Sequence, residues 1–107
     1  MATNQEFANY VCDQLSLAGF ITAKKMFGEY GIYCDGIIIG LLCDNQFFLK
    51  KTDEGRKVLK EIVEAPAYSG AKPTFLIESL EDKEYLETIV NATLKGLATK
   101  RVSIKKK

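Results

Sequence analysis

The sequence predicts an α+β domain in which helices cover one antiparallel sheet of four to five strands, as a two-layer sandwich. Three β-rich runs follow one another between residues 26 and 50, separated by Asp35-Gly36 and Asp44-Asn45. Asp-Gly between apolar runs favours a two-residue hairpin turn, because both residues tolerate positive φ. Helical patterns stand before and after these runs, so the expected order is α-β-β-β(-β)-α-β-α. We assign residues 1–99 to this single domain and residues 100–107 to a basic, disordered tail.

The first helix is predicted over residues 4–18. Thr3 and Glu6 have the spacing of a capping box, in which the two side chains satisfy free backbone N–H groups at the helix start. Gly19 follows as a residue suited to a left-handed C-terminal cap. The apolar stripe of this helix contains Phe7, Val11, Leu15 and Ala18. Residues 21–27 come next, either as a strand of their own or as the lead-in to the run GEYGIYC.

A turn at Asp35-Gly36 sets the predicted register of the central hairpin. It places Gly31 directly opposite Gly40, and this glycine pair leaves a bare patch of backbone between a tyrosine and an aliphatic cluster. Glycine inside a strand marks a bulge or a place where another backbone or a ligand comes close, and both interpretations stay open.

The third run extends the apolar character of this meander. A two-residue turn at Asp44-Asn45 places Phe47 and Leu49 on the same face as Gly40 and Leu42. Both faces of the middle strand are then largely apolar, and such a strand is usually buried on both sides. Either helices of this chain or a second copy of the protein could cover the second face.

Two more helices and one more strand are predicted in the second half. Thr52 is the expected N-cap of a helix that ends near Val63. The run TFLIE after Pro73 is typical of a strand. A third helix is expected to start at Ser79 or Glu81. Its apolar stripe contains Leu86, Ile89, Val90, Thr93, Leu94 and Leu97.

Residues 64–73 (EAPAYSGAKP) hold both prolines and are predicted to form a loop. A loop of this length in a small domain is often functional. Tyr68 and Gly70 could form an exposed contact site there. Equally, Tyr68 could fold back and cover one end of the sheet.

The composition points away from enzymes and metalloproteins. The 107 residues include no histidine, which removes the commonest metal ligand and the side chain best suited to acid–base catalysis near neutral pH. No phosphate-binding, metalloprotease or nucleophile-elbow motif is present. We therefore expect no catalytic residue, no metal and no cofactor. Glu29 is the best single candidate for carboxylate chemistry, but a carboxylate at a strand end is usually solvated.

The cysteine content, the terminal segments and the charge distribution limit the remaining possibilities for location and function. Three cysteines without a CxxC pair favour reduced thiols in a cytoplasmic protein, and no signal sequence or membrane-spanning run is visible. Five of the fifteen basic residues fall in the last eight positions, which contain no acid. This segment is either a solvated tail or an arm that binds nucleic acid. Its basic residues are Lys100, Arg101, Lys105, Lys106 and Lys107.

The run KKMFGEYGIYCDG, followed about thirty residues later by PAYSGAKP, resembles the N-terminal domain of the TfoX/Sxy family of bacterial competence regulators. The resemblance extends from Val11 to about Leu97. It implies a two-layer α/β domain linked to the control of DNA-uptake genes and without enzymatic activity. Full-length regulators of that family carry a second, helical domain, and this chain ends before such a domain could begin.

We therefore predict a non-catalytic regulatory or adaptor domain that contacts another protein, for example in the transcription machinery, and that could form a homodimer. The alternatives are direct nucleic-acid binding through the basic tail, and small-ligand binding at the Gly31/Gly40 patch. No membrane contact is expected. The candidate contact surface consists of Glu29, Gly31, Tyr33, Ile38, Gly40, Phe47, Tyr68 and Gly70.

Overall fold

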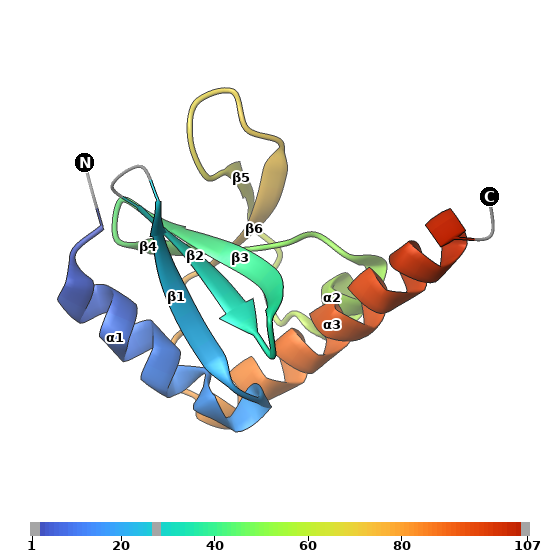
Figure 1. The fold of residues 1–107 in the computed structure, drawn as a ribbon, viewed down its shortest axis with the longest axis horizontal. Helices are drawn as coiled ribbons and strands as arrows, with labels where there is room; N and C mark the ends of the chain where they lie inside the picture. The colour runs from blue at the N-terminus through green and yellow to red at the C-terminus, as the bar shows by residue number, and fades with distance from the viewer. Residues whose placement is uncertain (1–2, 27–28, 106–107) are drawn as a thin grey trace.

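The computed structural model describes residues 3–26 and 29–105. Within these residues one antiparallel sheet of six strands, in the order β1-β2-β3-β4-β6-β5, carries α1 and α3 on one face (Figure 1). The predicted α+β class is confirmed, with one strand more than the upper estimate. The elements are α1 (Gln5–Gln14), the 3₁₀ helix η1 (Ser16–Ala18), β1 (Ile21–Met26), β2 (Glu29–Cys34), β3 (Ile37–Cys43), β4 (Gln46–Leu49), α2 (Asp53–Val58), β5 (Glu64–Pro66), β6 (Pro73–Ile77) and α3 (Lys83–Lys105).

Helix α1 starts one residue later than the predicted capping box. Asn4 is the N-cap, and its side chain accepts a hydrogen bond from the Phe7 N–H at 2.8 Å. The Thr3 hydroxyl instead donates to Glu29. The α-helix ends at Gln14, and η1 continues the chain to Gly19, whose φ of 154° few other residues adopt. The single helix predicted over residues 4–18 is thus two helical segments.

Both predicted two-residue turns are present. Asp35 and Gly36 have φ values of 52° and 84°, and Asp44 and Asn45 have values of 52° and 57°. These positive values are the reason that aspartate, asparagine and glycine occupy these turns. β1 is a strand of its own and pairs along its whole length with β2.

The predicted pairing of Gly31 with Gly40 is wrong. A β-bulge in β3 places Gly31 opposite Leu41 and Gly40 opposite Ile32. The bulge inserts one extra residue, so Ile39 and Gly40 together face Ile32. As a result Ile39 and Leu42 are both fully buried on the helix-covered face, whereas a regular strand would have turned Leu42 away from Ile39.

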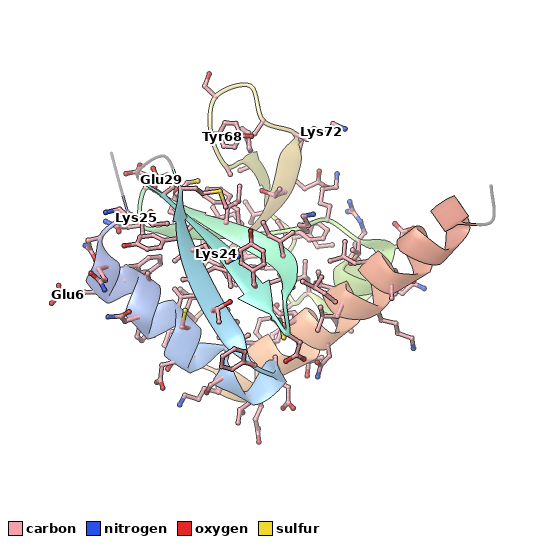
Figure 2. All side chains as sticks on the ribbon, viewed as in Figure 1. Glu6, Lys24, Lys25, Glu29, Tyr68 and Lys72 are labelled. Carbon is pink, nitrogen blue, oxygen red and sulfur yellow. The ribbon has the colours of Figure 1, made fainter. Side chains whose placement is uncertain are left out.

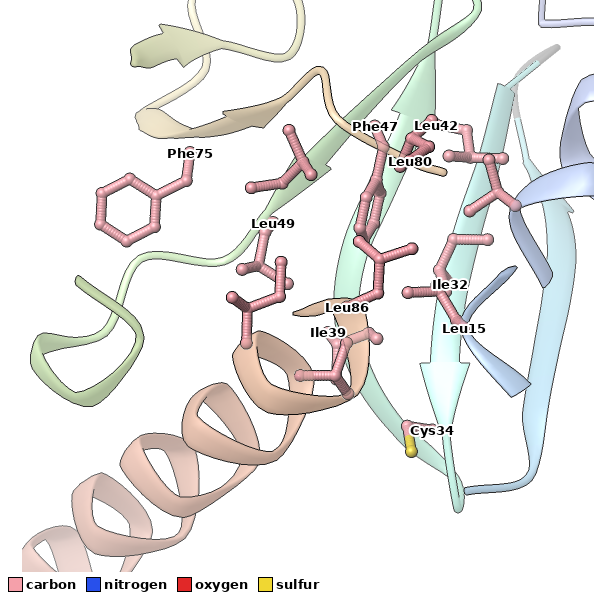
Figure 3. Packing of buried hydrophobic residues seen from close by; sticks show 14 of the residues in the cluster. Leu15, Ile32, Cys34, Ile39, Leu42, Phe47, Leu49, Phe75, Leu80 and Leu86 are labelled. Carbon is pink, nitrogen blue, oxygen red and sulfur yellow. The ribbon is translucent and has the colours of Figure 1, made fainter. Parts of the chain in front are cut away.

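Helices of the same chain cover Phe47 and Leu49. Both residues are fully buried, and their β3 partners are Leu42 and Gly40, as predicted. Figure 3 shows the Phe47 ring pointing toward α3, near Leu86. A second copy of the protein is therefore not needed to bury this pair.

The predicted loop over residues 64–73 is largely a hairpin. Glu64–Pro66 forms β5, which pairs with β6 and supplies the sixth strand. The two prolines face each other as Pro66 and Pro73 at the end of this ladder, where proline is tolerated because no further backbone bond is needed. Helix α2 ends at Val58, earlier than predicted, since the chain must turn to reach β5.

Helix α3 begins at Lys83, after Asp82, whose carboxylate accepts hydrogen bonds from the N–H groups of Glu84 and Tyr85, both at 3.1 Å. Its backbone continues to Lys105, whereas the sequence predicted that the domain would end at Thr99. None of the described helices is both long and apolar enough to cross a membrane.

Candidate functional site

The face of the sheet opposite α1 and α3, here called the outer face, brings together part of the predicted contact surface. Tyr33 and Ile38 are cross-strand partners on this face, and Gly31 lies beside them. The Lys24 ammonium lies 5.2 Å from the centre of the Tyr33 ring, a distance at which a cation is attracted to an aromatic face.

The predicted bare patch of backbone at Gly31 is covered by Met26. A Cβ atom at position 31 would collide with the terminal methyl group of Met26 and would lie 3.3 Å from the Tyr33 ring. Gly31 thus leaves room for a flexible side chain of the neighbouring strand. Gly40 faces the opposite, helix-covered side of the sheet. A Cβ atom at position 40 would collide there with the Phe48 carbonyl oxygen.

Phe47 does not belong to an exposed surface, because it lies in the core. Gly70 lies in the loop of the β5–β6 hairpin with a φ of 87°, and no atom lies close to the position of a Cβ there. The backbone at Lys100, Arg101 and Lys105 is helical, but their side chains, together with Lys106 and Lys107, lie outside what the structure describes.

The outer face is hollowed where the β5–β6 loop projects beside it. This pocket, here called the outer pocket, encloses about 540 Å³. Figure 2 shows Tyr68 on the loop, at the same end of the sheet as Glu29. Tyr68 lines the pocket and is 61% exposed, and its role as a contact residue stays a prediction. The lining residues are Met26, Glu29, Tyr30, Leu41, Cys43 and Tyr68.

Glu29 lies at the edge of the outer pocket and joins two distant parts of the chain. Its Oε1 atom accepts hydrogen bonds from the Thr3 hydroxyl at 2.6 Å, the Thr3 N–H at 2.9 Å and the Asp44 N–H at 3.2 Å. The Asn45 N–H donates in turn to the Thr3 hydroxyl at 3.1 Å. Desolvation raises the pKa of Glu29, but these hydrogen bonds outweigh it, and the net effect lowers the pKa. Glu29 therefore anchors the segment before α1 to the β3–β4 turn.

We expect Glu29→Gln to lower the free energy of unfolding at pH 7 by about 1 kcal/mol, because the amide accepts hydrogen bonds less strongly than the carboxylate. The folded-state pKa of Glu29 lies below its ordinary value. Its ionised form therefore contributes stability above the pH where free glutamate titrates, roughly pH 4, and this contribution is lost as the pH falls through the folded-state pKa. Urea unfolding at several pH values should show that the free energies of unfolding of the wild type and Glu29→Gln approach each other as the pH falls below about 4.

Glu6→Gln is the matched control for this prediction. Glu6 is exposed in the first turn of α1 and takes no part in the hydrogen bonds that join Glu29 to Thr3 and Asp44. It should change stability by no more than about 0.5 kcal/mol. Equal losses of stability for both substitutions, or a Glu29→Gln loss that does not shrink as the pH falls below about 4, would contradict the anchoring role.

The three cysteines are free thiols in the structure. Burial raises the pKa of Cys12, Cys34 and Cys43, and nearby carboxylates of Asp35 and Glu29 raise the last two further. A protonated thiol is a poor nucleophile and a poor metal ligand. Among residues 3–26 and 29–105 no group of three or more histidine, cysteine or acidic side chains could hold a metal ion.

Comparison with known proteins decides the family. A family model described as the TfoX N-terminal domain matches residues 13–96. This chain belongs to the TfoX N-terminal domain family. It is also 33% identical over 98 residues to a protein of Spirochaeta aurantia, described as an uncharacterised 12.7 kDa protein in the trpE 5′ region. The match covers 91% of this chain and 85% of that relative, which thus has room for little beyond one such domain.

In this TfoX N-terminal domain, the matched residues include all six strands and every residue that lines the outer pocket. Sequence reasoning missed Met26, Tyr30, Leu41 and Cys43 as members of this site. A regular register assigns Leu41 and Cys43 to the core-facing side of β3, and only the bulge turns them outward. The signal available was Gly40, since glycine inside a strand favours a bulge.

Proposed function

We propose that this TfoX N-terminal domain is a non-catalytic regulatory module that acts on transcription through contact with another protein. Membership of the family is the observation that carries the proposal, because the family resemblance implies a link to the control of DNA-uptake genes. The outer face supports a binding role, since it gathers tyrosine, isoleucine and lysine side chains in one place. Aromatic residues are enriched in protein interfaces.

The test is complementation in the native host. We expect deletion of the gene to change the transcript levels of DNA-uptake genes, and the wild-type protein to restore them. Ile38→Glu should fail to restore them, because it places a charge in the middle of the outer face. Ile62→Glu is the matched control, since Ile62 is 46% exposed in the segment between α2 and β5. No change in these transcripts on deletion, or full restoration by Ile38→Glu, would overturn the proposal.

Self-association is tested with the same variants by light scattering over a range of protein concentrations. A dimer that dissociates only in Ile38→Glu identifies a second copy as the partner on the outer face. A monomer at every concentration leaves a different protein as the partner.

Direct nucleic-acid binding is the second candidate function, favoured by the concentration of basic residues in the last eight positions. Binding of this kind weakens steeply with salt, because lysine and arginine release counterions from the phosphates. Removal of Lys105, Lys106 and Lys107 should then weaken binding to DNA at low salt. Binding that is absent at low salt, or insensitive to salt, would exclude this candidate.

A further inference from the structure

We infer that the outer pocket binds a small aromatic molecule that carries no negative charge. This inference goes beyond the proposed regulatory function, since it assigns a ligand to the domain in addition to a protein partner. Three properties of the pocket support it: its size, the chemistry of its walls and the sign of its charge.

The size of the pocket suits a small molecule. Its volume of about 540 Å³ falls within the range of small-molecule pockets, roughly 300 to 1,000 Å³. Most of its lining lies on the face of the sheet opposite the core, and Tyr30 lines the pocket while also belonging to the core cluster. Three neighbouring strands line the pocket: β1 through Met26, β2 through Glu29 and Tyr30, and β3 through Leu41 and Cys43.

The walls of the pocket favour an aromatic ring. Met26 and Cys43 offer polarisable sulfur atoms, which make favourable contacts with aromatic rings. Tyr68 offers a ring that is mostly exposed without a ligand and that could stack on one. Leu41 adds an aliphatic surface. A bound ring would therefore remove apolar surface from water on several sides at once.

The negative charge of Glu29 disfavours the binding of anions in the outer pocket. Among the described residues that line it, Glu29 alone carries a charged side chain. Its carboxylate is ionised at neutral pH, and the hydrogen bonds from Thr3 and Asp44 lower its pKa further below the ordinary value. Its charge also reaches the floor, where it contributes to the raised pKa of the Cys43 thiol. A ligand carboxylate in the pocket would face this like charge in partly desolvated surroundings.

The experiment compares two probes that share one ring, indole and indole-3-acetate, in titrations followed by amide NMR shifts of the full chain. We expect indole to cause saturable shifts at Leu41, Cys43 and Tyr68. Indole-3-acetate should bind at least about tenfold more weakly, the factor that corresponds to a modest like-charge repulsion. No saturable shift at these amides, or equal affinity for both probes, would overturn the inference.

Variants assign the binding to the outer pocket. Tyr68→Ala should weaken indole binding at least about fivefold while leaving the fold intact, because this side chain is outside the core. Tyr10→Ala, at an exposed tyrosine of α1, is the matched control and should bind indole as the wild type does. Glu29→Gln should reduce the difference in affinity between indole and indole-3-acetate. Equal indole binding by Tyr68→Ala and the wild type would overturn the assignment, and it would leave the complementation result with Ile38→Glu unaffected.

Discussion

Replacing Phe47 by alanine is expected to lower the free energy of unfolding by about 3 to 5 kcal/mol. The Phe47 side chain is fully buried in the cluster that joins the sheet to α1 and α3 (Figure 3). Truncation removes the transfer free energy of the ring and leaves a cavity that strand backbones on both sides of β4 cannot readily fill. The expected loss is a large fraction of the roughly 5 to 15 kcal/mol that stabilises a typical small domain.

Phe20→Ala is the matched control, because Phe20 is 72% exposed between η1 and β1. Phe20→Ala should lower the free energy of unfolding by no more than about 0.5 kcal/mol. Urea unfolding followed by circular dichroism measures both. Similar losses for the two phenylalanines would contradict the placement of Phe47 in the core and would return it to the set of contact residues.

Gly40→Ala is expected to lower the free energy of unfolding by about 2 to 3 kcal/mol, the upper part of the range for substitutions that overpack a core. A Cβ at this position would collide with the backbone carbonyl oxygen of Phe48 and would lie 3.0 Å from the Phe47 ring and 3.2 Å from the Leu49 Cα. Backbone atoms of β4 cannot move aside without breaking the β3–β4 ladder. The substitution therefore strains the centre of the sheet.

Gly31→Ala provides the comparison, because it also adds one methyl group to a central strand. The main obstacle at position 31 is the tip of the Met26 side chain, which can rotate away. We expect Gly31→Ala to lower the free energy of unfolding by less than about 1 kcal/mol. Thermal and urea unfolding of the pair should show the larger effect at Gly40, and a larger effect at Gly31 would contradict the described register.

Local chemistry made several elements predictable from the sequence. The turns at Asp35-Gly36 and Asp44-Asn45 were predictable because few residue pairs tolerate two positive φ values in succession. The apolar stripe of α3 was predictable because helical periodicity places its members on one side, and Leu86, Ile89 and Val90 are indeed fully buried. The run around Glu29 also identified the family, which the comparison with known proteins confirms.

The candidate site was less predictable, because it depends on contacts between distant segments. Tyr68 and Glu29 were expected to belong to a contact surface, and they lie together at the outer pocket. Their partners Leu41 and Cys43 were not expected there. A one-residue shift in a strand turns every following side chain to the other face, so the bulge at Ile39 and Gly40 changed the composition of both faces.

The sequence by itself determined the α+β class, the two tight turns, the apolar faces of the helices and the family. Only the tertiary structure decided the register of β3, the pairing of β5 with β6, the burial of Phe47 and the position of Glu29 between Thr3 and Asp44. The physical reason is the range of the interactions. Turn and helix preferences arise within a few neighbouring residues, whereas a bulge or a strand pair is selected by how the whole core packs.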